Sequence, residues 1–334
     1  MVAKVAVELT PEEKLEKLRF HHYTLKILLR LLMAFEAPSQ LFMFLYYIIP
    51  YLFEDYSQGT RNVLSFFVIL GTIEGLYNYF CVILADPSVP RSVQRNHQKS
   101  NSQDRMVTTT SDHVTDSSYH NGVSIDLYPD HDDDDLGLKW RYCEKCDCEM
   151  PPRSWHCDIC QGCILKRDHH CFMVGNCIGL NNQKYFAVLA LYALLCGWVG
   201  GYFQYKYLQT FYYPECWSWT DFLPPFAAYR WLFGRWPALS FHILVMICQV
   251  YLEFLFGTFG FLYFTFQMTV IAKGYTAFEM AKMMPVRNTN SKNFNFRTVF
   301  GDYWALNFIF PMTYFFPPKV DGIRWEGVKI DHNA

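Results

Sequence analysis

The fold of this chain is decided by one stretch, which reads Cys143-x2-Cys146-x9-His156-Cys157-x2-Cys160-x2-Cys163-x4-Asp168-His169-His170-Cys171-x5-Cys177. Two copies of one pattern overlap in it. The first copy is Cys143, Cys146, His156 and Cys163, and a shift of 14 residues gives Cys157, Cys160, His170 and Cys177. Because all four positions repeat, we expect two sites of the same kind.

Each copy supplies three thiolates and one imidazole, which is a ligand set that closes a tetrahedral structural zinc site. The Cys-x2-Cys spacing lets a tight turn direct two sulfurs to one ion, and the later His and Cys complete the shell. The pattern therefore predicts two Zn²⁺ ions, one for each copy. A cluster of buried or disulfide-bonded cysteines is the alternative, but it leaves the repeated histidines unexplained.

Three reactive side chains in the stretch are not needed as metal ligands. Cys171 is equivalent to Cys157 in the repeat, but Val174 stands where the next cysteine would be. An imidazole beside a thiol can take its proton, and a carboxylate can orient that imidazole. We therefore predict that Cys171 is a nucleophile, His169 its base and Asp168 the orienting group. The residues alone leave open that all three only support the neighbouring metal ligands.

The stretch resembles the cysteine-rich domain of the DHHC protein S-acyltransferases (palmitoyltransferases). Asp168-His169-His170-Cys171 matches the signature tetrapeptide, and the match continues through Cys177-x4-Asn182-x3-Phe186. The resemblance implies that His170 binds zinc, that His169 is the base and that Cys171 carries an acyl thioester. It also implies acyl-CoA as the acyl donor and cysteine thiols of target proteins as acceptors, in a two-step ping-pong reaction.

Composition and hydropathy indicate a membrane protein. The chain has 334 residues, of which 51% are hydrophobic, and a net charge of −2, which argues against a nucleic-acid binder. Four apolar segments approach the roughly 20 residues that a bilayer requires; they are residues 31–53, 63–85, 185–208 and 239–272. The expected fold is an α-helical integral membrane protein with four transmembrane helices and a two-zinc cysteine-rich domain, residues 139–184, between the second and third.

The remaining segments are polar or mixed. We expect residues 1–30 to be a cytosolic N-terminal segment without a signal peptide, and residues 86–138 to be a disordered acidic linker. Residues 209–238 form a luminal loop in this prediction, and residues 273–334 form a cytosolic tail.

The basic residues predict the orientation. They gather before the first span, between the second and third, and after the fourth, whereas the two opposite loops hold only Arg61, Arg230 and Arg235. The positive-inside rule therefore places both termini and the zinc domain in the cytosol, where thiol ligands stay reduced. We expect a multi-pass protein of the endomembranes, in the Golgi or the endoplasmic reticulum.

Three basic residues beside the signature are candidates for binding the donor. Arg153, Lys166 and Arg167 are predicted to attract the phosphates of CoA or acidic lipids. Alternatively, they are solvated basic residues at a membrane face.

Glu74 and Glu253 lie inside expected spans, where an ionisable group needs a partner or a cavity, so they either line a reaction chamber or make structural hydrogen bonds.

Further family motifs are present with changes. Asp86-Pro87-Ser88 resembles Asp-Pro-Gly, Thr276-Ala277-Phe278-Glu279 resembles Thr-Thr-x-Glu, and the segment from Asn295 to Gly301 is similar to the family's C-terminal motif. Many members have Pro-Trp after the signature cysteine, where this chain has Phe172-Met173.

The residues and the resemblance together favour an integral-membrane protein S-acyltransferase. Its partners would be fatty acyl-CoA, the lipid bilayer and protein substrates with membrane-proximal cysteines, with no nucleic acid. The alternative is a catalytically silent zinc-bearing scaffold at a membrane. A RING-like ubiquitin ligase does not account for Asp168, His169 and Cys171, and a metal transporter would carry its ligands inside the spans.

Overall fold

The computed structural model describes residues 10–94, 138–215, 218–234, 239–310, 315–318 and 320–330. Most of the expected acidic linker, residues 95–137, lies outside the described residues.

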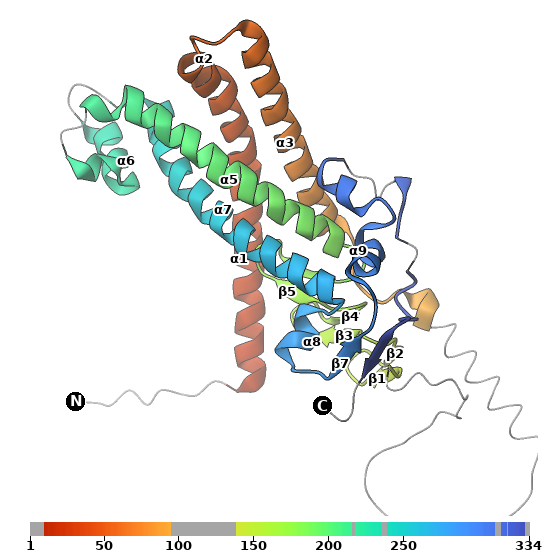
Figure 1. Ribbon diagram of the computed structural model, residues 1–334. Helices are drawn as coiled ribbons and strands as arrows, with labels where there is room; N and C mark the ends of the chain where they lie inside the picture. Colours follow the sequence, from red (N-terminus) through yellow and green to blue (C-terminus); the bar gives the residue numbers. More distant parts are fainter. Residues whose placement is uncertain are drawn as a thin grey trace, which may run out of the picture.

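Four long helices form the body of the molecule (Figure 1). They are α1 (Pro11–Met43), which continues through a π-helical turn (Phe44–Ile48) into α2 (Ile49–Leu52), then α3 (Gln58–Leu84), α5 (Gln183–Phe211) and α7 (Phe241–Lys273). Each is long and apolar enough to cross a membrane. The prediction of four membrane helices with a cysteine-rich region between the second and third is confirmed.

The helix boundaries follow local sequence signals. α1 begins after Thr10, whose side chain accepts from the backbone of Glu13 while Glu13 returns the bond, so the helix already covers most of the expected N-terminal segment. α7 ends at Gly274, which adopts a left-handed conformation with φ of 71°. This stop lets the chain turn back toward the cysteine-rich region.

α5 and α7 pack closely because glycines line their contact. A Cβ atom added at Gly197 would lie 2.5 Å from the carbonyl oxygen of Glu253, and one added at Gly260 would lie 2.4 Å from the backbone nitrogen of Leu194. The two backbones therefore touch, as small residues permit in membrane helix pairs.

The cysteine-rich region consists of three antiparallel hairpins. They are β1–β2 (Arg141–Cys143 and Cys148–Met150), β3–β4 (Trp155–Cys157 and Gly162–Ile164) and β5–β6 (His169–Cys171 and Asn176–Ile178). Each hairpin starts 14 residues after the one before. The turns repeat too, since Asp147, Gln161 and Gly175 all have φ between 50° and 64°. The 14-residue repeat in sequence is thus a repeat of one hairpin, present three times.

The residues that follow α3 form backbone hydrogen bonds with the cysteine-rich region. Leu165 donates its backbone N–H to Pro87 at 3.0 Å, and Val89 donates to Cys163 at 2.8 Å. The first residues of the expected linker, including the Asp86-Pro87-Ser88 motif, therefore join the end of α3 to the second hairpin.

The C-terminal residues fold against the same end of the bundle. They form α8 (Ala277–Ala281), β7 (Val286–Asn288), α9 (Lys292–Phe300), a 3-10 turn (Trp304–Phe308) and β8 (Val328–Ile330), which pairs with β7. Buried Val286, Trp325 and Val328 pack with Leu138 and Leu180. At the opposite end lie α6 (Pro224–Phe233) and two 3-10 turns (Tyr213–Glu215 and Trp219–Phe222).

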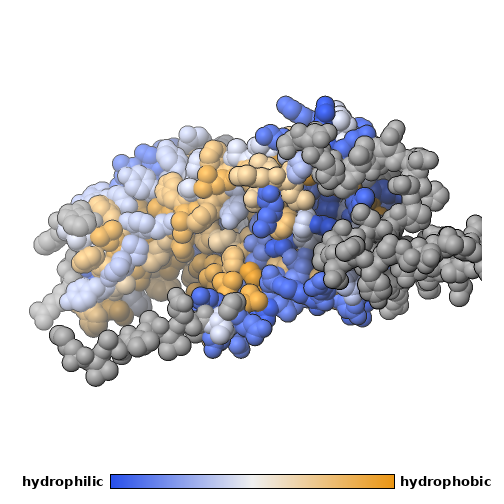
Figure 2. Space-filling model, turned by 90° about the horizontal axis from the view of Figure 1, so that it is seen from below, coloured by the Kyte–Doolittle hydropathy of each residue, from blue (hydrophilic) through white to orange (hydrophobic). Residues whose placement is uncertain are grey.

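The surface reflects this division. Figure 2 shows apolar side chains over the long helices and hydrophilic ones gathered toward the side of the hairpins and the C-terminal elements. Large apolar residues that are exposed on the helices include Phe66, Phe67, Leu84 and Leu262. An apolar exterior on long helices is what a bilayer covers.

The α5–α7 contact gives a testable prediction. We expect Gly260→Ala to lower the thermal unfolding midpoint of the purified protein, because its Cβ would meet backbone atoms of α5 and overpacking costs about 1–3 kcal/mol. Gly59→Ala is the matched control, since the nearest atom to its Cβ would be 3.7 Å away. Equal midpoints for both variants would contradict the proposed backbone contact.

Candidate functional site

The eight predicted metal ligands form two separate groups. Cys143, Cys146, His156 and Cys163 make one group, and Cys157, Cys160, His170 and Cys177 make the other; within each group the ligand atoms lie within 4.8 Å of one another. The middle hairpin explains the interleaving. His156 and Cys163, which pair across its two strands, belong to the first group, whereas Cys157 at the end of its first strand and Cys160 in its turn belong to the second.

The distances within each group fit a zinc ion. Zn–S bonds of about 2.3 Å and Zn–N bonds of about 2.0 Å place tetrahedral ligand atoms about 3.5–3.8 Å apart. In the second group, Nδ1 of His170 lies 3.6, 3.3 and 3.4 Å from the sulfurs of Cys157, Cys160 and Cys177. In the first group, Nδ1 of His156 lies 3.6 Å from the sulfur of Cys143 and 3.2 Å from that of Cys146.

The third hairpin has the same strand pairing as the other two, but the cysteine at the end of its first strand is not a candidate metal ligand. Cys171 pairs with Asn176 in β5–β6, just as Cys157 pairs with Gly162 in β3–β4 and Cys143 with Cys148 in β1–β2. Among the described residues Cys171 belongs to neither metal group, whereas His170 and Cys177 of the same hairpin do. A metal ion in the second group would therefore hold the hairpin that carries Cys171.

Asp168 and His169 form a hydrogen-bonded pair at the start of this hairpin. Nδ1 of His169 lies 2.8 Å from Oδ2 of Asp168, and the Asp168 side chain is fully buried. Burial opposes ionisation of Asp168, but the hydrogen bonds that it accepts outweigh burial and lower its pKa. Burial likewise opposes charge on His169, yet its hydrogen bond with Asp168 and the nearby Asp168 and Cys171 raise its pKa to about 9. Asp168 and His169 thus form a bonded pair with Asp168 ionised, beside Cys171 in the same hairpin, and the other ring nitrogen of His169, Nε2, has no hydrogen-bond partner among the described residues.

Both oxygens of Asp168 are held by donors from other elements. The backbone N–H of Ala277, at the start of α8, donates to Oδ1 at 2.7 Å, and Nε2 of Gln267 in α7 donates to Oδ2 at 2.7 Å. The Thr276-to-Glu279 motif therefore acts at the site through a backbone group, which alanine supplies as well as threonine.

A relay of buried amides continues from Gln267. Its Oε1 accepts from Nε2 of Gln183 at 3.1 Å, and Oε1 of Gln183 accepts from Nζ of Lys166 at 3.2 Å. An ammonium only donates and a carboxylate only accepts, so the two ends fix the orientation of both amides. The relay of Lys166, Gln183, Gln267 and Asp168 links the start of α5 and the end of α7 to His169.

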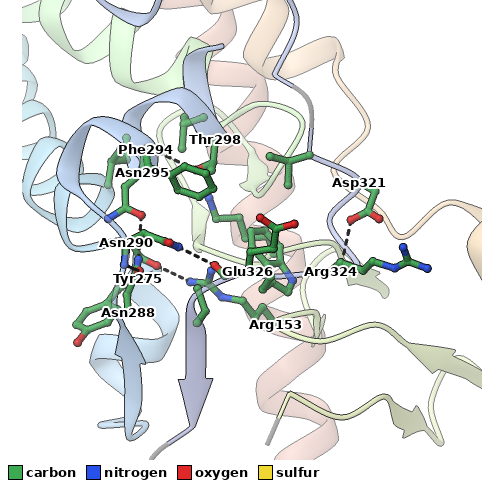
Figure 3. Close-up of a pocket in the computed structure, with 17 residues that line it drawn as sticks. Arg153, Tyr275, Asn288, Asn290, Phe294, Asn295, Thr298, Asp321, Arg324 and Glu326 are labelled. Atoms are coloured by element: carbon green, nitrogen blue, oxygen red, sulfur yellow. Dashed lines mark hydrogen bonds between the residues drawn. The ribbon is translucent and has the colours of Figure 1, made fainter. Parts of the chain in front are cut away.

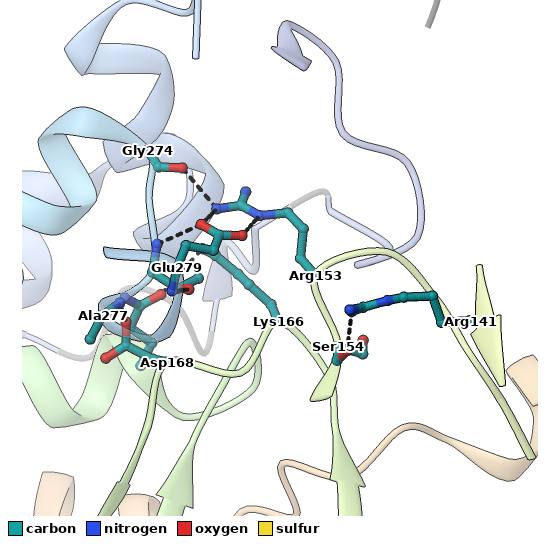
Figure 4. A network of polar contacts seen from close by, with 10 residues as sticks. Arg141, Arg153, Ser154, Lys166, Asp168, Gly274, Ala277 and Glu279 are labelled. Atoms are coloured by element: carbon teal, nitrogen blue, oxygen red, sulfur yellow. Dashed lines mark hydrogen bonds and ion pairs between the residues drawn. The ribbon is translucent and has the colours of Figure 1, made fainter. Parts of the chain in front are cut away.

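A second polar contact fastens α8 to the hairpins (Figure 4). Arg153 donates from Nε and Nη2 to the two carboxylate oxygens of Glu279 at 2.6 and 2.7 Å, and from Nη2 to the carbonyl of Gly274 at 2.9 Å. Both side chains are at most 3% exposed. This bidentate pair keeps the start of α8, and with it Ala277, against Asp168.

Cys171 packs against residues that line an apolar cavity of the helix bundle. It is 2% exposed and belongs to an apolar cluster with Val174 and Phe186. Those two residues also line a cavity of about 90 Å³, together with Met173 and Tyr263. The cavity shares Leu189 and Ala193 with a second one of about 120 Å³, which shares Cys196 with a third of about 370 Å³ between α1, α3 and α5. A series of apolar cavities thus extends from the neighbours of Cys171 into the membrane part.

Phe172 and Met173 stand where the sequence departs from the Pro-Trp of the family motif, and they lie near this cavity. Met173 lines the first cavity, whereas Phe172 is 39% exposed and its ring packs 5.1 Å from that of His170 and 5.4 Å from that of His22 in α1. Met173 is therefore part of the cavity wall, and Phe172 is part of the contact with α1.

The three basic candidates are placed away from open solvent. Arg153 and Lys166 are buried, and burial followed by the nearby charge of Arg153 lowers the pKa of Lys166 to about 7. Arg167 donates to the carbonyl oxygen of His156 and lies over the ring of Phe278 at 4.8 Å. Their contacts are structural, and binding of CoA phosphates by them stays a prediction.

The two membrane glutamates have different surroundings. Glu253 accepts from Gln40 at 2.7 Å and from Gln204 at 2.6 Å, and it lines the middle cavity. Glu74 lies 3.4 Å from the amide of Asn78 in its own helix. Glu253 therefore combines both predicted roles, lining and hydrogen bonding, while Glu74 makes a local contact.

Sequence reasoning missed Gln183, Gln267 and the pairing of Arg153 with Glu279. Gln267 stands inside a predicted span, and a buried polar side chain in a membrane helix is a signal that it has a partner. The partner itself is not readable from the sequence, since Gln267 and Asp168 are 99 residues apart.

The matches to known proteins agree with this site. Residues 138–284 match the family model described as DHHC palmitoyltransferase, so the resemblance noted from the sequence is confirmed. The matched residues hold both metal groups, Asp168, His169, Cys171 and α8.

Curated relatives match over parts of their length. The chain is 40% identical over 136 residues to the probable protein S-acyltransferase 13 of Arabidopsis thaliana, which covers 40% of this chain and 38% of that protein. It is 31% identical over 182 residues to the human palmitoyltransferase ZDHHC2, covering 50% and 42%. For the human probable palmitoyltransferase ZDHHC24 the match is 50% over 58 residues, covering 17% and 20%. The chain thus matches less than half of each of these relatives.

The metal groups give a testable prediction. We expect two zinc ions for each chain in the purified protein, and about one in His156→Ala, because three remaining thiolates hold the ion poorly. Cys148→Ala is the control, because Cys148 lies 3.9 Å from the sulfur of Cys163 yet outside both groups. Metal analysis by mass spectrometry should find two ions in that control; a loss there instead of in His156→Ala would reject the assignment.

Proposed function

We propose that this chain, whose residues 138–284 form a DHHC palmitoyltransferase domain, is a protein S-acyltransferase that moves a long-chain fatty acyl group from acyl-CoA through Cys171 to cysteine thiols of target proteins. The single observation that carries the proposal is the buried Asp168–His169 pair beside Cys171, whose apolar neighbours Val174 and Phe186 line the first of the apolar cavities.

The reaction follows from the roles of these groups. His169, oriented by Asp168, accepts the proton of the Cys171 thiol and holds it as an imidazolium, which its raised pKa favours, and the Cys171 thiolate then attacks the thioester carbonyl of acyl-CoA. The bond between the carbonyl carbon and the CoA sulfur breaks, and CoA leaves as a thiol with the proton from His169. A substrate cysteine then attacks the Cys171 thioester, gives its proton to His169, and Cys171 regains a proton as it leaves.

Zinc would have a structural role here. Bound to the two ligand groups, it would hold the hairpins in place, since each group joins strands of neighbouring hairpins. The protein residues do the chemistry: the backbone of Ala277 and the amide of Gln267 keep Asp168 in position for His169.

The cavities suit a fatty chain. They are lined mostly by apolar side chains, and burial of each methylene contributes about 0.8 kcal/mol. Because the first cavity adjoins Cys171, an acyl chain on this thiol would extend between α1, α3, α5 and α7. CoA phosphates would remain at the polar end, where Arg167 is the candidate that is not fully buried.

The proposed orientation places the hairpins and both termini in the cytosol, in an endomembrane such as the Golgi or the endoplasmic reticulum. The basic residues before α1, around the hairpins and after α7 support it through the positive-inside rule. Acceptor proteins would present cysteines close to the membrane, because Cys171 lies near the ends of α3 and α5.

Transfer of label from palmitoyl-CoA tests the proposal directly. We expect the wild-type protein to become labelled through a hydroxylamine-sensitive bond, and Cys171→Ala, with its zinc retained, to stay unlabelled. No label on a zinc-replete wild type would favour the catalytically silent scaffold, and equal label on both would show that another cysteine reacts.

The amide relay supplies a second prediction. Gln267→Leu removes a donor to Asp168, and we expect the rate of Cys171 acylation to fall about tenfold or more, the effect of losing a hydrogen bond to a charged group, with the KM for palmitoyl-CoA little changed. Gln249→Leu is the matched control, because Gln249 is a buried amide of the same helix that donates to Ser39 instead.

The outcome distinguishes positioning from folding. A structural defect would lower zinc content and rate together, whereas a positioning defect lowers the rate alone. Equal rates for the two variants would contradict the role of Gln267.

A further inference from the structure

A cavity of about 360 Å³ lies on the polar side of the molecule, between the hairpins, the end of α7, α9 and the last described segment (Figure 3). Lys166, Trp325 and Arg153 line its inner wall, and the exposed residues Asp321, Arg324 and Glu326 lie at its rim. It shares no lining residue with the three apolar cavities near Cys171.

Two buried side chains on the inner wall carry N–H donors that have no hydrogen-bond acceptor among the described residues. The indole N–H of Trp325 is buried and has no hydrogen-bond partner, although an indole nitrogen only donates. The ammonium of Lys166 has three donors, and its one hydrogen bond within the described residues goes to Gln183. Lys166 lies 5.6 Å from the centre of the Trp325 ring, and Arg153 lies 4.6 Å from it on the same wall.

The nearby carboxylates do not satisfy these donors. Asp321 accepts the backbone N–H groups of Ile323 and Arg324, and Glu279 is bound by Arg153. Within the described residues Glu326 makes no ion pair within 4.0 Å, and neither does Lys166. Asparagines of the wall are also engaged, since Asn288 donates to Asn295 and Asn290 donates to the backbone of Glu326.

Donors without acceptors, arranged around an open cavity, point to a ligand that brings its own acceptors. Buried polar groups are nearly always hydrogen-bonded, so an unpaired indole N–H and a buried ammonium call for an oxygen-rich partner. A tetrahedral oxyanion offers several acceptor atoms to donors that converge from different directions. The cavity volume leaves room for more than the anion alone.

We propose that this cavity is a binding site for the phosphate group of a ligand, held by Lys166 and Trp325 and separate from the path of the acyl donor. This site goes beyond the proposed acyl transfer, and binding to it is measurable without any turnover. An occupant would also contact the first member of the relay, because Lys166 donates to Gln183 and the relay ends at Asp168.

Stabilisation by inorganic phosphate tests the site. The full chain in phosphatidylcholine nanodiscs is titrated with phosphate at constant ionic strength, and its thermal unfolding midpoint is followed, since a ligand that binds only the folded state raises it. We expect Trp325→Phe, which keeps an aromatic side chain and removes the N–H, to weaken the apparent affinity about threefold or more, and Lys166→Gln to weaken it about tenfold or more. Arg287→Gln, which removes an exposed charge outside the cavity, should bind as wild type.

Each outcome decides the proposal. An equal effect of phosphate on wild type, Trp325→Phe and Arg287→Gln would show a general salt effect and overturn it. A stabilisation that appears only in nanodiscs with a phosphoinositide, and is lost in Trp325→Phe, would assign the phosphate to a lipid headgroup. Free CoA that stabilises wild type but not Trp325→Phe would overturn the separation from the acyl donor. No stabilisation in any of the three arms would reject the site, and Trp325→Phe keeps the test valid if Lys166→Gln does not fold.

Discussion

The position of Cys171 depends on the candidate metal group next to it in the chain. This group consists of Cys157, Cys160, His170 and Cys177. His170 precedes Cys171 and Cys177 faces His170 in the same hairpin, so the ligands fix both strands around the thiol. In the first two hairpins the equivalent position is held by Cys143 and Cys157, and both belong to the candidate metal groups. A metal bound by this group would hold the thiol rigidly while leaving it outside the ligand set, as the proposed nucleophile requires.

Asp168 connects that hairpin to the membrane helices. Its carboxylate accepts from His169, from the backbone of Ala277 and from Gln267, so it joins the hairpins, α8 and α7 at one buried point. The ion pair of Arg153 and Glu279 holds α8 in place from the other side. A buried ion pair that loses one partner leaves an uncompensated charge, so these contacts specify one arrangement of the elements more than they add stability.

Much of this arrangement was predictable from the sequence because it depends on local spacing. The ligand repeat required only residues within 35 positions, and the spans required only runs of apolar residues. The contacts of Gln183, Gln267 and Glu279 were not predictable, since each joins segments far apart in the chain and a single polar residue does not name its partner. Lys166 illustrates the limit: its basic character suggested a phosphate contact at the surface, whereas the fold buries it beside Trp325, at the end of a relay.

The central claim is that an acyl group on Cys171 extends into the cavities between the membrane helices. The most direct measurement uses a palmitoyl-CoA analogue with a photoreactive diazirine at the end of the chain, followed by mass spectrometry of the crosslinked peptides. The account predicts Cys171-dependent crosslinks to cavity-lining segments of α3 and α5, such as those with Thr72 and Cys196, and none in Cys171→Ala. Crosslinks confined to the hairpins or the C-terminal elements would contradict it.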